Sequence, residues 1–406
     1  MKKIHYGWFI VLACCAISCC NALVMQVSAN FYMPVAEELG VGIGKLTIYV
    51  TIMSLTMALM FPIVGKYLEQ YLKPMLLLGG VLQLLAMALM SVFSNVYLFW
   101  AAGLFIGVGA AITMSMSIPI LINMWFVEKR GFAMGLALSF MGVAATVLNL
   151  LAGSLIGGGG WRMAYLALSA CVAVVYFPAI LFLVKTPQQK GVQPYGVTST
   201  ESDNSTEVIT KTATNGMNMA QAIKHPAFYC MLVCAATLAA ASSEATQVSA
   251  FCTGHFGLSI EAGASMLAIL SVGVMLGNVI MGIIDDKAGH MVTWFLAIVL
   301  ILLSQIVLIA NMTAMLMISV FVFGFATTIY TVLLPLMTDS IFGGADYSKI
   351  WGYVMSAGSI LGAIIVPIYG TIFDITGSYS LVFILVAVLT VICGTTGALA
   401  LKIAKK

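Results

Sequence analysis

Long runs of apolar residues, separated by short polar breaks, form most of the 406-residue chain. The run from Pro74 to Phe93 is typical, because it is almost wholly apolar and does not alternate between apolar and polar positions. A helix needs about 20 mostly apolar residues to cross a bilayer, whereas a strand of a membrane barrel needs about 10 alternating ones. A helix also satisfies all its backbone polar groups within lipid. The pattern therefore predicts an all-α membrane protein with twelve transmembrane helices, at residues 7–30, 44–65, 74–93, 96–122, 131–156, 161–184, 226–251, 261–283, 291–310, 313–338, 350–373 and 379–401.

Composition narrows the class of protein further. Charged residues make up 8% of the chain and hydrophobic residues 62%, whereas soluble domains contain about 25% charged residues. These values exclude a soluble enzyme, a nucleic-acid binder and a disordered regulator. The net charge of +3 is too small to indicate a polyanionic partner such as nucleic acid. The predicted helices contain no His/Cys/Asp cluster and no nucleophile beside a base, so we expect no enzyme activity, no cofactor and no metal site.

The basic residues predict the orientation of the helices. If the N-terminus is cytoplasmic and the helices alternate in direction, fifteen of the seventeen Lys and Arg residues fall on the cytoplasmic side, and only Lys45 and Arg162 fall outside. This bias is typical of the positive-inside rule. Met1-Lys2-Lys3 before an apolar run also fits a signal peptide, but the run is longer than usual and no clear cleavage site follows. We therefore expect a multi-pass protein of the inner (plasma) membrane with an uncleaved first helix and both termini in the cytoplasm.

A long polar stretch divides the chain into two similar parts. Its Ser, Thr, Asn, Gln, Gly and Pro content is typical of a linker. Gln26-Val27-Ser28-Ala29 of the first helix recurs as Gln247-Val248-Ser249-Ala250 of the seventh, and Pro119 of the fourth recurs as Pro335 of the tenth. Repeats in order at a nearly constant offset indicate a duplication. The sequence predicts two pseudo-symmetric six-helix halves, residues 1–185 and 225–406, joined by a cytoplasmic linker at 186–224.

Such duplicated halves resemble the major facilitator superfamily. The loop after the eighth helix, Gly282-Ile283-Ile284-Asp285-Asp286-Lys287-Ala288-Gly289-His290, is similar to the signature Gly-x-x-x-Asp-Arg/Lys-x-Gly-Arg of that family, and the loop after the second helix is a degraded copy. Glycine permits a tight exit from the helix, and the carboxylate can bridge to cationic groups or helix N-termini when the cytoplasmic side is shut. The resemblance implies a cytoplasmic gate formed by Gly65, Glu69, Gly282, Asp286 and Lys287.

Within this superfamily the sequence is most similar to the branch of oxalate/formate antiporters and monocarboxylate porters. The motifs that carry this resemblance are spread over most of the chain, at residues 5–8, 123–131, 160–162, 191–196 and 342–343. The resemblance implies a secondary active transporter, a symporter or antiporter, that moves a small organic solute by alternating access. A monocarboxylate or other organic acid is the expected solute, with a proton as the expected coupling ion. We expect the protein to act as a monomer in the lipid bilayer.

The chain differs from that branch in its basic residues. Branch members that carry carboxylates usually have cationic side chains in the eighth and eleventh helices, and this chain has no Arg or Lys in either. Where monocarboxylate porters tend to have a lysine in the first helix, Gln26 is the nearest candidate. Because an unpaired buried charge is very costly, a dianion such as oxalate is disfavoured. The alternatives are a monoanion held by hydrogen bonds, a carboxylic acid taken with its proton, or export of a neutral or amphipathic compound.

Polar side chains within the predicted helices are the candidates for solute binding. The resemblance implies that helices one, four, seven and ten line the central path, although helix–helix hydrogen bonds can account for any single polar residue. We expect about half of the set to contact the solute. Gln26 and Gln247 are the strongest candidates, because both are donors and acceptors and they are related by the repeat. The substrate-binding set is Gln26, Asn30, Thr113, Ser117, Gln247, Ser249, Asn278, Thr327, Tyr330 and Thr331.

One ionisable residue lies inside a predicted helix. Glu244 is about 18 residues into the seventh helix, which places it about 27 Å along the axis, towards the outer side. A buried carboxyl group at this position can carry a coupling proton. The alternative is a carboxylate that reaches outer water or caps a helix break after Ala241-Ser242-Ser243.

Overall fold

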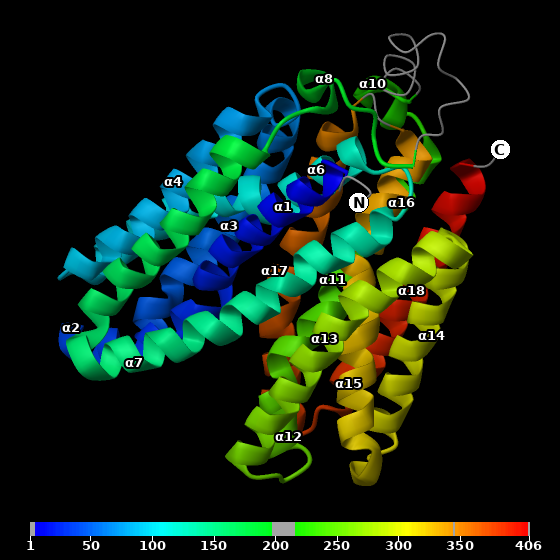
Figure 1. Cartoon of the computed structure of the whole chain (residues 1–406). Helices are drawn as coiled ribbons and strands as arrows, with labels where there is room; N and C mark the ends of the chain where they lie inside the picture. The colour runs from blue at the N-terminus through cyan, green and yellow to red at the C-terminus, as the bar shows by residue number, and fades with distance from the viewer. Residues whose placement is uncertain (1–4, 197–215, 344–345, 405–406) are drawn as a thin grey trace, which may run out of the picture. The chain divides into compact units, whose positions relative to one another are not determined.

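The computed structural model describes residues 5–196, 216–343 and 346–404, which form helices joined by short loops, with two isolated β-bridges. Eleven continuous helical segments of this described part are long and apolar enough to cross a membrane. Uninterrupted crossing helices are α3 (Ile43–Tyr67), α4 (Leu72–Leu89), α13 (Ile260–Ala288), α14 (His290–Ile309), α17 (Tyr347–Thr376) and α18 (Ser380–Ala404) (Figure 1).

The longest helix, α7 (Arg130–Pro178), joins two of the predicted crossings. Gly160, the last of four consecutive glycines, has φ 78° and ψ 167°, a backbone conformation that glycine adopts without strain. A straight helix of 49 residues would be about 74 Å long, more than twice the roughly 30 Å thickness of the hydrocarbon core. The kink at Gly160 therefore divides α7 into the fifth and sixth of twelve crossings.

The first and fourth helix of each six-helix set are interrupted at corresponding places. The first crossing consists of α1 (Gly7–Ala22), η1 (Leu23–Val27), η2 (Ser28–Phe31) and α2 (Tyr32–Leu39), and the fourth of α5 (Val96–Ala110), η4 (Ala111–Met116) and α6 (Ser117–Trp125). The seventh consists of α11 (Pro226–Ser242), η7 (Ser243–Gln247) and α12 (Val248–Gly254), and the tenth of α15 (Leu316–Thr327), η9 (Thr328–Tyr330) and α16 (Leu333–Phe342).

Proline explains two of these interruptions. Pro119 in α6 and Pro335 in α16 each follow an interruption within a few residues. Proline has no N–H and therefore leaves the carbonyl four residues earlier without its helical partner. Hydroxyl groups satisfy carbonyls of the interrupted turns, since Ser117 Oγ donates to Ile112 O and Thr331 Oγ1 donates to Thr328 O at 3.0 Å. Polar side chains thus lie at these interruptions of otherwise apolar helices.

The chain forms two compact units, which are described separately. Unit 1 consists of Met1–Glu128 and Leu136–Val197, and unit 2 of Lys129–Gly135 and Thr198–Lys406. The first turn of α7 thus belongs to unit 2. The predicted boundaries at 185 and 225 remain a prediction, and much of the linker between them, residues 197–215, lies outside the described residues. At its two ends the linker forms single helical turns, α8 (Pro187–Lys190) and α10 (Met219–Ala222).

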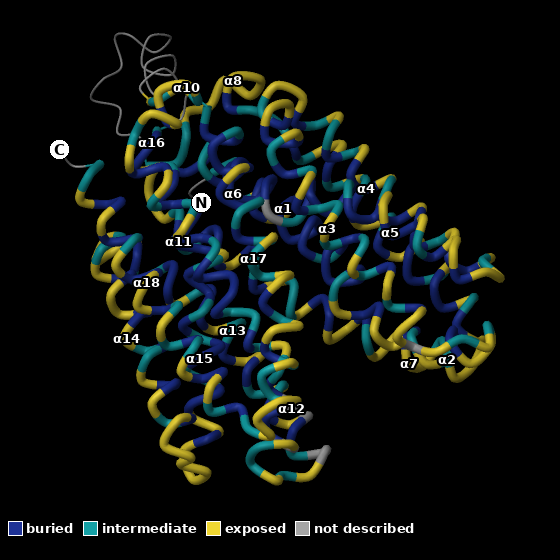
Figure 2. Tube along the Cα trace, turned by 180° about the vertical axis from the view of Figure 1, so that it is seen from behind, coloured by how far each residue is buried: buried dark blue, intermediate teal, exposed yellow. Residues whose placement is uncertain are grey.

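Exposed apolar side chains occur along most of the crossing helices. Buried and exposed positions alternate around each helix (Figure 2), and many exposed positions carry large apolar residues. Leu150 of α7, for example, is 74% exposed. Apolar surface on this scale is not tolerated in water but matches the hydrocarbon core of a bilayer.

Candidate functional site

A buried polar cluster connects the first, third and fourth crossings of unit 1. Gln83 of α4 donates from Nε2 to Thr113 Oγ1 at 2.9 Å, and Thr113 Oγ1 donates to Asn21 Oδ1 at 2.9 Å. Cys20 Sγ donates to Gln83 Oε1 at 2.9 Å. Gln83, Thr113 and Asn21 are at most 2% exposed. Thr113, which the sequence suggested for solute binding, therefore uses its hydroxyl group inside the unit, and the equally buried Ser117 uses its own on Ile112.

Three amide side chains of unit 1 are more accessible. Gln26 in η1 and Asn30 in η2 are exposed, and Asn149 of α7 is half-buried. Asn30 Nδ2 donates to Asn149 Oδ1 at 2.6 Å and to Val27 O at 3.0 Å. The sequence analysis missed Asn149, although a lone asparagine in the middle of the predicted helix 131–156 was a usable signal. We call Gln26, Asn30 and Asn149 the amide cluster.

The candidates of unit 2 are less concentrated. Asn278 of α13 is 5% exposed, and its Oδ1 accepts from Thr331 Oγ1 at 3.0 Å. Gln247 is half-buried, and its Oε1 accepts from the hydroxyl of Tyr379 at 3.2 Å. Thr327 donates to Gly324 O at 3.1 Å, and Tyr330 lies against Gly358. Ser249 belongs to α12, but its side chain lies outside the described part of the structure.

Glu244 lies in η7, the interruption between α11 and α12. Its side chain is 1% exposed, so the carboxyl group does not reach water in this structure. Its Oε2 accepts a hydrogen bond of 2.8 Å from Nε2 of Gln305, a fully buried residue of α14. The sequence analysis did not identify Gln305, because nothing in the linear pattern connects the seventh helix with the ninth.

A charged cluster surrounds the first turn of α7 within unit 2. Both oxygens of the Asp286 carboxylate accept backbone hydrogen bonds, from Gly131 N at 2.8 Å and from Phe132 N at 2.9 Å. Arg130 pairs with Asp339 of α16 at 2.8 Å. A carboxylate at a helix N-terminus is favourable because it meets unpaired N–H groups and the positive end of the helix dipole.

The other residues of the predicted gate lie at helix ends. Gly282 of α13 contacts Gly131, and Lys287 is exposed at the end of the same helix. Gly65 is buried near the end of α3, and Glu69 is half-buried in the turn that follows. Their role as a gate stays a prediction.

Asp346 lies at the start of α17 and connects it to α10. It accepts from Lys349 Nζ at 2.5 Å and from Met219 N of α10 at 2.8 Å. Burial alone would raise the pKa of Asp346, but these hydrogen bonds and the Lys349 charge lower it below its ordinary value. The carboxylate is therefore ionised at neutral pH and ties α10 to α17.

Three of the motifs that carry the sequence resemblance meet in unit 1. His5 Nε2 lies 3.0 Å from Gln193 O, and Tyr195 N donates to Trp125 O at 2.8 Å. The rings of His5 and Tyr195 are 5.5 Å apart, edge to face. Residues 5–8, 125–126 and 191–196 thus form a single aromatic contact region that holds the start of the linker against the rest of unit 1.

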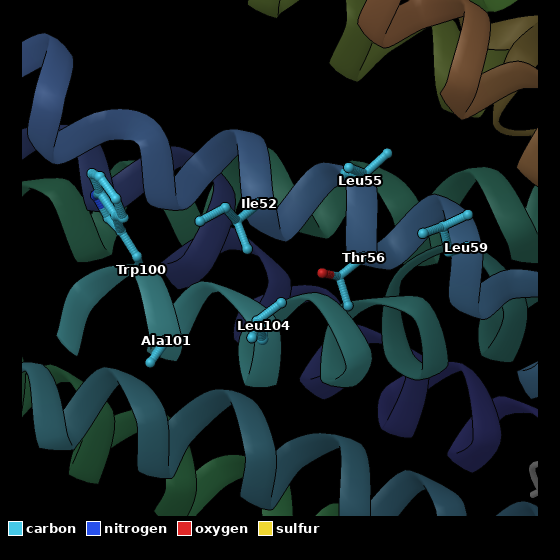
Figure 3. A pocket seen from close by; sticks show the side chains of 7 residues that line it. All are labelled: Ile52, Leu55, Thr56, Leu59, Trp100, Ala101 and Leu104. Atoms are coloured by element: carbon cyan, nitrogen blue, oxygen red, sulfur yellow. The ribbon is translucent and has the colours of Figure 1, made fainter. Parts of the chain in front are cut away.

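An open apolar groove runs between α3 and α5. Its volume is about 460 Å³, and Thr56 is the polar side chain among its lining residues (Figure 3), which are Ile52, Leu55, Thr56, Leu59, Trp100, Ala101 and Leu104. The two helices approach closely on one side of the groove, because Gly103 and Gly107 pack against the backbone of Tyr49 and Met53.

Comparison with known proteins agrees with this architecture. Residues 14–309 and 232–406 match the Major Facilitator Superfamily. Monocarboxylate transporter 12 of Xenopus laevis is 22% identical over 402 residues, which cover 96% of this chain and 87% of the relative. The oxalate:formate antiporter of Oxalobacter formigenes is 23% identical over 408 residues, which cover 92% and 89%. The structure of the proton:xylose symporter XylE bound to 6-bromo-6-deoxy-D-glucose is similar with a TM-score of 0.77 at 11% identity, covering 96% of this chain and 94% of that one.

These similarities extend over nearly the whole chain, as does the helical architecture. The predicted fold, an all-α membrane protein with twelve transmembrane helices in two pseudo-symmetric halves, is confirmed. The protein is a multi-pass membrane transporter for a small-molecule solute rather than an enzyme. The chain belongs to the Major Facilitator Superfamily.

Proposed function

We propose that this transporter moves a monocarboxylate together with a proton by alternating access. It does so as a monomer of the plasma membrane with both termini in the cytoplasm. The names of its relatives, monocarboxylate transporters and an oxalate:formate antiporter, support an organic acid as the solute. The distribution of charge supports a monocarboxylate rather than a dianion.

The burial of Glu244 is the observation that carries the proposal. Among the described acidic residues, Glu244 and Asp285 are the buried ones, and Asp285 pairs with His290 at 2.8 Å near the end of α13. Glu244 has a neutral partner instead, and it sits in a helix interruption where the backbone can rearrange. A carboxyl group in such surroundings can take up and release a proton as the surroundings change.

The positions of the basic residues point to the same conclusion. Each described Lys and Arg lies in a loop or within about one turn of a helix end or of the Gly160 kink. A carboxylate entering the transporter therefore finds no cation in the middle of a helix to neutralise it. Moving the anion together with a proton keeps the loaded transporter electroneutral.

The amide cluster is the proposed solute contact of unit 1. Side-chain amides donate hydrogen bonds to a carboxylate without adding a fixed charge. Gln247 and Asn278 are the proposed contacts in unit 2. The Asp286 cap on α7 and the Arg130–Asp339 pair would act as the cytoplasmic gate, together with Gly65, Glu69, Gly282 and Lys287.

Uptake into vesicles reconstituted with the purified protein tests this function. Labelled short hydroxy or keto acids should accumulate when the outside is made more acidic than the inside. Glu244→Gln should abolish the dependence on the pH gradient, while the exposed Glu37→Gln should not. Unchanged gradient-driven accumulation in Glu244→Gln would remove Glu244 from the proton pathway.

Export of a neutral or amphipathic compound is the second candidate function. The apolar groove between α3 and α5 favours it, because large apolar surfaces bind amphipathic molecules. A thermal-shift screen separates the two functions. Stabilisation by short hydroxy or keto acids supports the first, and stabilisation by larger apolar compounds that Leu104→Asn abolishes supports the second.

A further inference from the structure

The two units have a buried glutamine at the same place in the repeat. Gln83 of α4 and Gln305 of α14 are 222 positions apart, and both are fully buried. In unit 1, both ends of the Gln83 amide are used, since Oε1 accepts from Cys20 and Nε2 donates to Thr113. At this position of the fold, the side-chain amide of Gln83 is therefore hydrogen-bonded at both ends, and its partners Cys20 and Thr113 are neutral.

In unit 2 the corresponding arrangement is incomplete. Gln305 Nε2 donates to Glu244 Oε2, but Gln305 Oε1 and Glu244 Oε1 are both buried without a hydrogen-bond partner. Each unsatisfied buried polar atom costs about 1–3 kcal/mol. If Glu244 is ionised, both orphaned atoms are acceptors and neither can satisfy the other.

One proton on Glu244 gives both unpaired oxygens a hydrogen-bond partner. A protonated Oε1 becomes a donor, and the remaining acceptor of the pair is Gln305 Oε1. Carboxylic acid and amide then share two hydrogen bonds in a ring. Turning the amide round does not remove the need for the proton, because Gln305 Oε1 would then face Glu244 Oε2 and require an O–H from it.

Among the described residues, no other neighbour of Glu244 supplies a compensating charge. Tyr369 of α17 is a titratable side chain that interacts with it, and the Tyr369 hydroxyl already donates to Ala240 O at 2.9 Å. The ion pairs found among the described residues do not include Glu244. An ionised carboxylate would therefore be buried with one neutral donor, which is costly in a membrane protein.

We propose that Glu244 and Gln305 form a cyclic acid–amide pair, in which Glu244 Oε1–H donates to Gln305 Oε1. The pair extends the proposed proton role of Glu244, and its significance for transport rests on that proposed function. Gln305 is the positioning residue, because it holds the neutral acid in this state. The proton can leave only when η7 moves relative to α14 and the ring opens, so loss of the proton is tied to a change of conformation.

Infrared difference spectra of the purified full-length protein test the pair directly. The spectrum at neutral pH minus that at alkaline pH should contain the C=O band of a protonated carboxylic acid, and Glu244→Gln should remove it. Gln305→Met should move the band to higher frequency, because the C=O loses the hydrogen bond from Nε2. Gln83→Met is the matched control, since it alters the corresponding position of unit 1 and should leave the band in place.

Each outcome decides a separate point. Absence of a band that depends on Glu244 overturns the proposal, and a band that Gln305→Met does not shift overturns the pairing. If Glu244→Gln does not fold, Glu244→Asp serves instead and should move the band. Gradient-driven uptake is measured on the same variants. A shifted band in Gln305→Met beside undiminished coupling in Glu244→Gln would leave the pair standing while the proposed role of Glu244 in proton-coupled transport fails.

Discussion

At the scale of single residues, the proposed solute recognition relies on neutral amides and the proposed proton uptake on one buried carboxyl group. The amide cluster presents N–H groups on accessible parts of the first and fifth crossings, and the Glu244–Gln305 pair is buried inside unit 2. Under the proposed function, these two sets of residues together replace a buried ion pair. Buried ion pairs are expensive to dehydrate, which explains why an acid and amides can replace them.

Asn149 should contribute to the affinity for a monocarboxylate. A hydrogen bond to a charged group contributes about 1.5–3 kcal/mol, so Asn149→Ala should raise KM by about 10–150-fold with little change in kcat. Asn149→Asp should be worse, because it adds a charge of the same sign as the solute. Initial rates of uptake measure both variants, with the exposed Thr395→Ala of α18 as control. Equal KM values for Asn149→Ala and the control would exclude contact with the solute.

At the scale of secondary-structure elements, glycine sets how closely α7 and α13 approach. A Cβ atom on Gly135 would collide with the carbonyl oxygen of Asn278, and one on Gly131 would collide with that of Gly282. Glycine permits such an approach of two backbones. Asp286 caps the first turn of α7 at the same place. The close packing of the two helices and the cap therefore stabilise the same contact between α7 and α13.

Gly135→Ala should therefore weaken this contact. The added methyl group must displace backbone atoms, which costs about 1–3 kcal/mol. Gly142→Ala is the matched control on the same helix, since a Cβ there meets nothing within 4 Å, and it should be neutral or slightly stabilising. The midpoint of thermal unfolding in detergent, followed by tryptophan fluorescence, measures the difference. Equal midpoints for the two variants would show that the contact between α7 and α13 tolerates a side chain at residue 135.

The two charges of the Arg130–Asp339 ion pair should be interchangeable. Arg130 and Asp339 are partly exposed, so each single charge reversal, Arg130→Asp or Asp339→Arg, should cost about 1–2 kcal/mol. Uptake should fall about tenfold in each single variant and recover most of the loss in the double variant. Initial uptake rates provide the measurement. A double variant as slow as the single variants would show that uptake does not depend on the ion pair.

At the scale of the whole molecule, the repeat gives each unit the same set of interruptions and a glutamine at the same buried place. The units differ in the partner of that glutamine, which is a neutral group in unit 1 and a carboxyl group in unit 2. The duplication thus supplied two similar frameworks, of which one carries the ionisable group. Under the proposed function, this asymmetry confines proton transfer to one unit.

Transport of a monoanion with one proton should be electroneutral. At equilibrium, each unit of pH difference should then support up to about tenfold accumulation of the solute, because one pH unit corresponds to 1.36 kcal/mol. A potassium diffusion potential without a pH gradient should produce no accumulation. Vesicle uptake with each gradient imposed separately checks this, and accumulation driven by the potential alone would contradict one-to-one coupling.

The hydrophobic pattern was sufficient to predict the crossings, and short recurring motifs were sufficient for the repeat and the superfamily resemblance. Apolar runs long enough to cross a bilayer can only be helices, so the pattern leaves little freedom at that level. The position of Glu244 in the seventh crossing and the importance of the Asp286 carboxylate could also be predicted. A charge within an apolar run or within a repeated motif can be recognised from the linear sequence.

What only the tertiary structure decided is which way the polar side chains point. Thr113 and Ser117 belong to the same predicted set as Gln26 and Asn30, yet the first two are fully buried and the last two are exposed. The contacts of Asn149 and Gln305 became visible only in the structure, because their partners are more than 60 positions away in the sequence. The physical reason is that the interrupted turns shift the rotation of each helix. The direction of a side chain therefore depends on how neighbouring helices pack, and local sequence does not specify that.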